Sequence, residues 1–366
     1  MKEGKKMKIL TISDSFKGTL SSSQVGEIVS TYYQKQGNEA DFIPISDGGE
    51  GFLEVIHYVT KLPFQEKNVS DPLFRPTTAT YLMDENKKTA YLELAQASGL
   101  TKIEEDKRNA IFASTYGLGE LIKHVILTHH PKKIVLGIGG SATSDVGTGL
   151  LEAMGVEFID ANGFVLKHMN NLKLMQIKKI KTRAFKRLIK GIEFVTLTDV
   201  TNPLNGKKGC IQVFAKQKGA KEETFYLMER NVLHFYHKTL DKMSQAIDFS
   251  GAGAAGGVGY TMKYYFNSQM ASGIESILEL VDFKKKVQAY DVIITGEGHL
   301  DAQSLDGKVI SGIKAYHPKR LVIITGSSSL QSDDEIYAIV PTVATLEESL
   351  QSPSECLKKL LEQVKL

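Results

Sequence analysis

Short apolar strands that alternate with helices at both ends of the chain constrain its fold more than any other feature. Near the N-terminus, residues 8–13 and 40–45 are apolar runs of strand length, and residues 21–34 between them predict a helix. A second helix is predicted over residues 50–60. This alternation of strand and helix predicts a parallel sheet with helices on its faces.

The same pattern returns towards the C-terminus. Three more short apolar runs predict strands at residues 291–295, 320–325 and 338–343. The two ends together supply five strands, which is enough for one doubly wound sheet, and a long segment is inserted between the second and the third. The sequence therefore predicts an α/β fold in which a doubly wound parallel sheet is split by an insertion.

The middle of the chain follows a different pattern. Residues 76–95 alternate between apolar and polar side chains, which predicts an antiparallel hairpin that turns at residues 84–86. Residues 132–137 and 194–198 predict two further strands, and each ends in a loop rich in glycine or acidic residues. Because no fixed-period repeat occurs, a solenoid is not expected.

Composition and charge exclude several classes of protein. With 42% hydrophobic residues and a formal net charge of +3, the 366-residue chain is not disordered, and its charge does not indicate a nucleic-acid-binding protein. Cys210 and Cys356 lie too far apart for a disulfide framework or a cysteine-based zinc site, which favours a reducing compartment. No apolar run has the length of a membrane span or of a signal-peptide core, so we expect a cytoplasmic protein.

One segment is locally basic. Residues 167–190 contain nine Lys or Arg and no Asp or Glu. Such a run fits a nucleic-acid or acidic partner, but it fits equally the solvated face of a helix whose other side is apolar. We favour the solvated face because the rest of the chain is balanced in charge.

Acidic residues beside glycines follow the predicted strands and form the main chemical pattern. The carboxyl ends of parallel strands border the ligand crevice of an open α/β sheet. Carboxylates there can hold a magnesium ion or accept a hydroxyl proton, although each one taken singly could be an ordinary turn or helix cap. These acidic candidates are Asp14, Asp47, Glu50, Asp145, Asp199, Glu297 and Asp301.

Two further motifs are suited to anions. Residues 137–149 contain five glycines and lead into a predicted helix, so their backbone N–H groups could cradle phosphate; the alternative is close packing of helix on strand. Lys17 follows a strand and suits a phosphate or carboxylate, or is a solvated turn lysine. Residues 251–256 match the dinucleotide fingerprint by letters but lack a preceding strand, so a nicotinamide site is not expected.

Nine sequence blocks occur in one order along the whole chain. They are SDSFKGTLSS (13–22), SDGGEG (46–51), ELAQASGL (93–100), STYGLGELI (114–122), GIGGSATSDVGTG (137–149), TDVTNPLNG (198–206), QKGA (217–220), GAGAAGGVG (251–259) and TGEGHLDAQSLDGK (295–308). Together they resemble the glycerate kinase family of the bacterial two-domain type. Nine ordered blocks are far more specific than any one of them.

The resemblance implies a fold and a reaction. The fold would be a flavodoxin-like domain, residues 1–62 with 286–366, split by a larger inserted α/β domain, residues 63–285. The reaction would be ATP-dependent phosphorylation of D-glycerate, commonly to 2-phosphoglycerate, in the cleft between the domains. The implied partners are ATP, Mg²⁺ and the small-molecule substrate, with no nucleic acid and no membrane.

The resemblance also implies site residues, position by position. Asp199 and Asp47 are candidates for the carboxylate that accepts the glycerate proton, and Lys17 would pair with the substrate carboxylate or the transferring phosphate. The residues implied in substrate binding are Asp14, Ser15, Ser98, Glu50 and Asn202. The residues implied in nucleotide binding are Gly139, Gly140, Ser141, Gly296, Glu297 and Asp301. Asp145 and Glu297 are the candidates for Mg²⁺.

Some positions depart from the family pattern. Val146 stands where the family has glycine, and a β-branched residue adopts a positive φ only at an energetic cost. His299 replaces an arginine and is mostly uncharged near neutral pH, which would weaken phosphate binding. These changes leave two alternatives open: a related kinase of another small hydroxy acid, or a metabolite-binding homologue with reduced activity.

Overall fold

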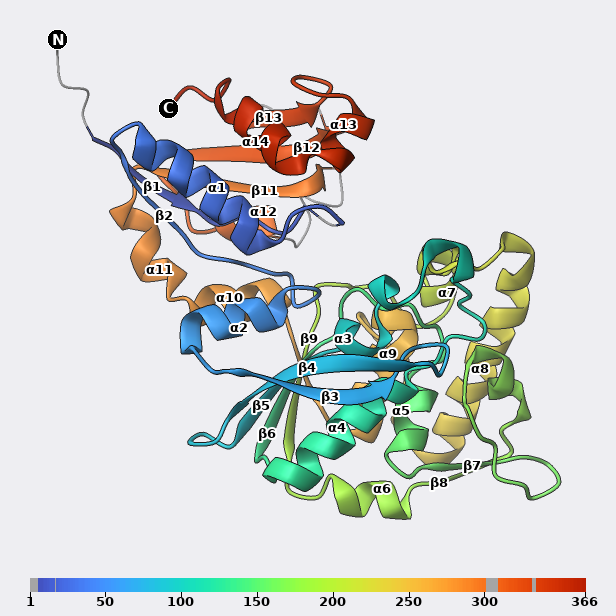
Figure 1. The fold of residues 1–366 in the computed structure, drawn as a ribbon. Coiled ribbons are helices and arrows are strands. Elements are labelled where there is room, and N and C mark those ends of the chain that lie inside the picture. Colours follow the sequence, from blue (N-terminus) through green and yellow to red (C-terminus); the bar gives the residue numbers. More distant parts are fainter. Residues whose placement is uncertain (1–5, 17, 301–308, 331–333) are drawn as a thin grey trace, which may run out of the picture. The chain divides into compact units, whose positions relative to one another are not determined.

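The computed structural model divides the chain into two compact units (Figure 1). It describes residues 6–16, 18–300, 309–330 and 334–366. The first unit comprises Met1–Lys61 with Ser272–Leu366, and the second comprises Leu62–Ala271. Residues 272–285, which we expected in the insertion, therefore lie in the first unit.

Five parallel strands form the sheet of the first unit. Their spatial order is β2-β1-β11-β12-β13, which is the strand order of flavodoxin-like sheets, and the predicted fold class is confirmed. The strand β1 aligns its Ile9 with Ala40 of β2 on one side and with Val292 of β11 on the other. The strands are β1 (Lys8–Thr11), β2 (Glu39–Phe42), β11 (Val292–Leu300), β12 (Leu321–Ser328) and β13 (Glu335–Val340).

Helices cover both faces of this sheet, as a doubly wound fold requires. Ile324 belongs to the apolar cluster that contains α1 and α14 side chains, whereas its neighbour Ile323 packs with Ile310 of α12 on the opposite face. The first helix begins with a capping box in which Ser21 and Gln24 satisfy each other's backbone N–H groups. The helices are α1 (Ser22–Lys35), α2 (Phe52–Thr60), α10 (Gly273–Leu280), α11 (Phe283–Lys286), α12 (Val309–Lys314), α13 (Leu346–Gln351) and α14 (Pro353–Leu361).

The second unit is built on a six-stranded mixed sheet. Its order is β10-β9-β6-β5-β4-β3; the first four strands are parallel, and β5, β4 and β3 pair antiparallel. The predicted hairpin is confirmed, because β4 and β5 pair in the register Leu82↔Tyr91. The strands are β3 (Phe64–Ser70), β4 (Pro76–Asp84), β5 (Thr89–Glu93), β6 (Lys133–Gly137), β9 (Glu193–Leu197) and β10 (Gln269–Ala271), with a separate pair formed by β7 (Glu157–Ile159) and β8 (Lys179–Lys181).

The helices of the second unit share one apolar core with this sheet. Leu92 and Leu136 from the strands are buried in the same cluster as Leu121 and Phe235 from helices. The helices are α3 (Ala95–Ser98), α4 (Tyr116–His129), α5 (Thr148–Ala153), α6 (Arg183–Leu188), α7 (Cys210–Phe214), α8 (Phe225–Lys242) and α9 (Ala254–Tyr265). In the described part of the chain no helix is both long and apolar enough to cross a membrane.

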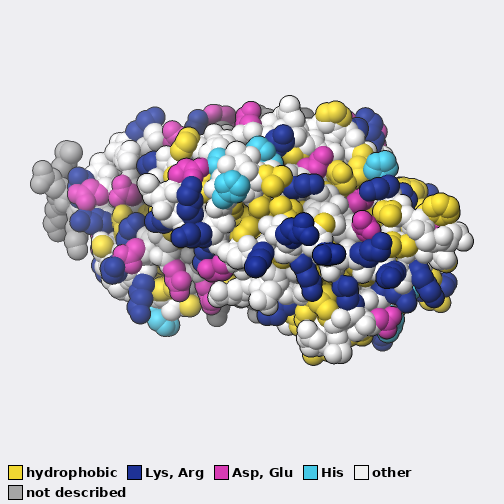
Figure 2. Space-filling model, turned by 90° about the horizontal axis from the view of Figure 1, so that it is seen from below, with side chains coloured by type: hydrophobic (Ala, Val, Ile, Leu, Met, Phe, Trp, Pro, Cys, Tyr) yellow, Lys and Arg dark blue, Asp and Glu magenta, His cyan; other side chains and the backbone are white. Residues whose placement is uncertain are grey.

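The basic segment 167–190 is not one helical face. It runs through the 3₁₀ helix η3 (Asn171–Gln176), the strand β8 and the helix α6. Its apolar residues Leu174, Ile177 and Phe185 are buried, while most of its lysines and arginines are exposed. Figure 2 shows Lys and Arg side chains spread over the face that carries these elements, which fits the solvated surface favoured from sequence.

Candidate active site

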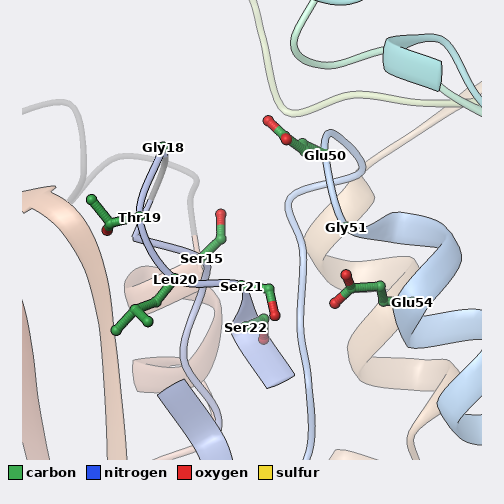
Figure 3. Close-up of a pocket in the computed structure, with 9 residues that line it drawn as sticks. All are labelled: Ser15, Gly18, Thr19, Leu20, Ser21, Ser22, Glu50, Gly51 and Glu54. Carbon is green, nitrogen blue, oxygen red and sulfur yellow. The ribbon is translucent and has the colours of Figure 1, made fainter. Parts of the chain in front are cut away.

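The loops that follow β1 and β2 line a pocket in the first unit (Figure 3). Its volume is about 220 Å³, which suits a ligand smaller than a drug-sized molecule. In Figure 3 the side chains of Ser21 and Glu54 point toward one another across it, and Glu50 extends from the loop at its rim. The pocket is lined by Ser15, Gly18, Thr19, Leu20, Ser21, Ser22, Glu50, Gly51 and Glu54.

The hydroxyl of Ser22 ties the two loops together. It donates to the carbonyl oxygen of Ser13 (2.6 Å), at the end of the first strand, and accepts from the backbone N–H of Ile45 (2.8 Å), after the second. Ser22 is buried and belongs to the first turn of α1. The start of this helix therefore fixes the spacing between the loops that carry Asp14 and Asp47.

Asp14 lies at the centre of the first loop. Its carboxylate accepts from the backbone N–H of Ser15 (2.7 Å), and its own N–H donates to the carbonyl of Gly296 (2.9 Å). These bonds join three predicted site residues from segments 282 positions apart (296 minus 14). The predicted neighbour Lys17 lies outside the described residues.

Asp47 organises the second loop. Its carboxylate accepts from the backbone N–H of Gly49 (2.9 Å), and Gly48 and Gly51 adopt φ values of 81° and 90° that favour glycine. Gly273 packs directly against this loop, because a Cβ at position 273 would lie 2.1 Å from the carbonyl oxygen of Asp47. Asp47 is half-buried and Glu50 is exposed, so both carboxylates are within reach of solvent.

Gly296 and Glu297 lie within a strand rather than after the strand that the sequence predicted over residues 291–295. Parallel pairing with β12 continues through Glu297↔Thr325 and His299↔Ser327, so β11 extends to Leu300. A Cβ at position 296 would lie 1.8 Å from the carbonyl oxygen of Ile324, which explains the glycine there. The predicted site residue Asp301 lies outside the described residues.

In the second unit the glycine-rich loop pairs with the segment after β5. The N–H of Ala142 donates to the carbonyl of Ser98 (2.9 Å), and the N–H of Leu100 donates to the carbonyl of Gly140 (2.9 Å). Gly140 adopts a φ of 72° and is exposed, whereas Ser98 and Ser141 are buried. Four predicted site residues, Ser98, Gly139, Gly140 and Ser141, therefore lie side by side.

Asp145, predicted as a magnesium ligand, is fully buried. Its carboxylate accepts from the backbone N–H and the hydroxyl of Thr115 (2.9 and 2.8 Å) and from the N–H groups of Gly147 (3.2 Å) and Gly149 (3.0 Å). Burial raises the pKa of the Asp145 carboxyl, although the four donors favour its charged form. This geometry favours a structural role in shaping the loop over a role as a metal ligand.

Val146 adopts the left-handed conformation that its β-branched side chain disfavours. Its φ is 51° and its side chain is buried. Such a residue stores on the order of 1–3 kcal/mol of backbone strain. The loop holds it in place, since the N–H of Val146 donates to the carbonyl of Gly256 (3.1 Å) and its carbonyl accepts from the hydroxyl of Thr261. The departure noted in the sequence is therefore accommodated at an energetic cost.

Asp199 and Asn202 lie on the loop that follows β9, and both are half-buried. The Asn202 side-chain amide donates to the backbone carbonyl of Lys208 (2.9 Å), and the backbone carbonyl of Asn202 accepts from the N–H of Gly253 (2.9 Å). The two motifs at 198–206 and 251–259 thus pack against each other. The fingerprint-like glycines are explained by this close approach.

Lys218 is a functional candidate that the sequence analysis did not select. Its side chain is buried, with 3% exposed, and its Nζ atom donates to the Ser141 hydroxyl (2.7 Å) and to the carbonyl of Thr143 (2.8 Å). Burial lowers the pKa of Lys218 to about 8, although Cys210 and Asp145 act in the opposite direction. The available signal was the QKGA block, in which this lysine stands.

The described residues fit a phosphate-bearing ligand better than they fit a metal on its own. Three hydroxyls near the glycine-rich loop, those of Ser98, Thr143 and Ser144, are buried without a hydrogen-bond partner among the described residues. A buried polar group without a partner calls for an explanation, such as a bound water or ion. No group of three or more His, Cys, Asp or Glu in the described ranges could hold a metal ion. Mg²⁺ commonly binds through one or two carboxylates and the substrate phosphates, so Glu297, which is half-buried, stays a candidate.

We expect Gly256→Ala to lower the free energy of unfolding by about 3 kcal/mol. Gly256 has a φ of 65°, and a Cβ there would lie 2.0 Å from the carbonyl oxygen of Thr143, so both strain and a backbone clash oppose the change. The matched control is Gly163→Ala, because Gly163 has a φ of 88° but no atom within 4 Å of the added Cβ. Gly163→Ala should lower the free energy of unfolding by about 1 kcal/mol. Equal losses in urea unfolding followed by circular dichroism would contradict the close packing of these loops.

Comparisons with known proteins agree on one family. A family model described as the glycerate kinase family matches residues 9–366. A glycerate kinase from Bacillus subtilis (strain 168) is 34% identical over 96% of this chain and 95% of its own length. A glycerate 2-kinase from Escherichia coli (strain K12) is 32% identical over 94% of this chain and 93% of its own. The crystal structure of a glycerate kinase 2 from Salmonella typhimurium LT2 has a TM-score of 0.77 at 28% identity and covers 98% of this chain and 100% of its own.

Proposed function

The chain belongs to the glycerate kinase family, and from that premise we propose that it transfers a phosphoryl group from ATP to D-glycerate, giving 2-phosphoglycerate. The observation that carries the proposal is the pocket at the carboxyl edge of the flavodoxin-order sheet, where hydroxyls and carboxylates from the loops after β1 and β2 meet. The loops that hold it contain Asp14 and Asp47. Its volume of about 220 Å³ suits a small hydroxy acid and is below the size of a usual drug-sized ligand site.

Each kind of group in this pocket has a task that suits glycerate. Serine hydroxyls and the N–H groups of the first turn of α1 can donate to the substrate carboxylate, because a helix N-terminus favours negative charge. Glu50 and Glu54 can accept hydrogen bonds from the substrate hydroxyls. We assign Lys17 to the substrate carboxylate or the transferring phosphate, as the family resemblance implies.

Phosphoryl transfer depends mostly on positioning and on charge stabilisation. We propose that Asp47 accepts the proton of the attacking glycerate hydroxyl, with Asp199 as the alternative base. Asp47 is suited to this task because its carboxylate is half-buried, is held by the Gly49 N–H and keeps access to solvent.

The glycine-rich loop is assigned to ATP. Gly139 and Gly140 are accessible and can approach phosphate through their backbone, while Ser141 supplies a hydroxyl. When bound, Mg²⁺ neutralises charge on the phosphates, and Glu297 is the residue we assign to it. The hydrogen-bond donors that we expect this loop to offer the phosphates are backbone N–H groups and a hydroxyl of the protein itself.

The test is ADP release from the purified chain with Mg·ATP, with and without D-glycerate. We expect glycerate-dependent release, with phosphorus NMR showing the phosphate ester on carbon 2 of the product. A panel of other small hydroxy acids distinguishes a glycerate kinase from a related kinase, which would release ADP faster with another acid than with glycerate. No release with any of them, from protein that binds glycerate and is folded by circular dichroism, would contradict the kinase proposal and support a metabolite-binding homologue.

A further inference from the structure

The hydrogen bond between Lys218 and Ser141 has only one possible direction. An ammonium group has donors and no acceptor, so the Ser141 oxygen must accept from it at 2.7 Å. The hydroxyl hydrogen of Ser141 is then left for another acceptor. A hydroxyl that accepts from a cation is also a stronger donor, because hydrogen bonds in a chain polarise one another.

The charge of Lys218 is only partly compensated within the described structure, because Asp145 acts on it at a distance without forming an ion pair. Its side chain is 3% exposed, and no described carboxylate forms an ion pair with it. Keeping a buried charge without a directly paired counter-charge is costly, so an anion near this position would be stabilised. The accessible backbone of Gly139 and Gly140 lies directly beside Ser141 and offers such an anion a route to it.

Three hydroxyls of the glycine-rich loop and of the segment paired with it are also unpaired within the described structure. The hydroxyls of Ser98, Thr143 and Ser144 are fully buried and have no hydrogen-bond partner among the described residues. Ser98 belongs to the segment that pairs with the glycine-rich loop, and the Thr143 carbonyl is the second acceptor of Lys218. Lys218 therefore binds a loop whose buried polar groups are not all paired within the described residues.

We propose that Lys218 is a positioning residue of a phosphate site, in which its buried ammonium orients the Ser141 hydroxyl as a donor to the phosphate chain of ADP or ATP. The identity of the ligand as ADP or ATP rests on the proposed function, whereas the geometry around Lys218 does not. Lys218 acts through Ser141 and through the loop carbonyl of Thr143, and its ammonium supplies positive charge without direct contact.

The test measures the Kd for Mg·ADP by calorimetry. Lys218→Met keeps the length of the side chain and removes the charge, and we expect binding at least tenfold weaker. Ser141→Ala should weaken binding by a similar factor, and the double variant should be no weaker than Lys218→Met alone, because both changes remove one coupled interaction. The melting temperature of Lys218→Met should stay within a few degrees of wild type, since removing a buried unpaired charge offsets the lost hydrogen bonds.

The matched control is Lys216→Met. Lys216 stands in the same 3₁₀ turn, but its side chain is 75% exposed and pairs with Glu222 at the surface, so its loss should leave the Kd unchanged. Unchanged ADP binding in Lys218→Met would overturn the proposal. So would additive losses in the double variant, because a lysine that merely braces the fold would act independently of the Ser141 hydroxyl.

A second measurement serves if Lys218→Met does not fold. In the wild-type protein ADP affinity should fall above pH 8 as Lys218 loses its proton, and Ser141→Ala should abolish this fall. The other groups that act on the lysine are Cys210 and Asp145; burial raises the pKa of Cys210 to about 12, so it does not titrate in this window. An affinity independent of pH from 7 to 9.5 would overturn the proposal.

The outcome is separable from that of the proposed function. Binding of ADP that depends on Lys218 and Ser141, in protein that does not phosphorylate glycerate, supports the phosphate site and removes the substrate assignment. Glycerate turnover that is unaffected by either variant retains the proposed function and overturns the role of Lys218. A wild-type protein that binds neither Mg·ADP nor inorganic pyrophosphate overturns the phosphate site outright.

Discussion

Asp145→Ala is expected to lower the free energy of unfolding by about 4 kcal/mol, because it leaves three backbone N–H groups and one hydroxyl buried without their acceptor. A loss of this size is a large fraction of the total stability of a typical domain. Urea unfolding followed by circular dichroism measures it. In hydrogen-exchange measurements, the peptides that contain Thr115, Gly147 and Gly149 should be the first to lose protection.

Asp160→Ala is the matched control for this change. Asp160 also accepts two backbone N–H groups, from Asn162 (2.9 Å) and Phe164 (2.8 Å), but it lies in an accessible turn where water can replace the lost acceptor. Asp160→Ala should lower the free energy of unfolding by about 1 kcal/mol. If Asp145→Ala were as mild and instead raised the Mg²⁺ requirement of the reaction, the structural role would be wrong and the magnesium role correct.

Asp47→Asn is expected to lower kcat by about a thousandfold, which is within the usual contribution of a general base. Asparagine keeps an oxygen that can accept from the Gly49 N–H, so the loop should keep its conformation while the proton acceptor is lost. The KM for glycerate should change much less than kcat, because the hydrogen-bonding groups that line the pocket are retained. Steady-state ADP release over a range of glycerate concentrations separates the two constants.

Two further variants decide what this result means. Asp41→Asn changes a carboxylate on the strand β2 that pairs with the Tyr290 hydroxyl at the surface (3.0 Å), and it should leave kcat unchanged. Asp199→Asn tests the alternative base. A thousandfold loss in Asp199→Asn together with near-normal turnover in Asp47→Asn would transfer the role of base to Asp199.

The order of secondary-structure elements was predictable from the chain itself. The strands β1, β11 and β12 of the first unit contain short, buried apolar runs, and burial of such a run between helices depends mainly on its own composition. The strand β2 (Glu39–Phe42) was less well placed, because it ends before the apolar residues 43–45 that predicted it. The hairpin of β4 and β5 was also predictable, because its apolar and polar side chains alternate along the sequence. Strand ends were less well placed: β11 continues to Leu300 because pairing with β12 extends it through glycine.

The spatial grouping of the candidate site residues was predictable only in part. Ser98, Gly140 and Ser141 lie side by side, as do the loops of Asp14 and Asp47, because the carboxyl ends of neighbouring strands share one edge of a sheet. The conformation of Val146 also follows the expectation from its position in the loop, with a φ of 51°. Such features follow from local sequence and from sheet topology.

The burial and the partners of Asp145 and Lys218 could be seen only in the tertiary structure. An acid beside glycines looks the same in a sequence whether it faces a ligand or caps a buried loop, and a lysine is exposed unless distant segments cover it. The partner of Asp145 is Thr115, 30 positions away, and the partner of Lys218 is Ser141, 77 positions away. The sequence by itself indicated the order of the strands and the family, because short apolar runs and ordered motifs are properties of the chain itself. Only the fold decided which charges are buried, because burial is produced by segments that meet in space.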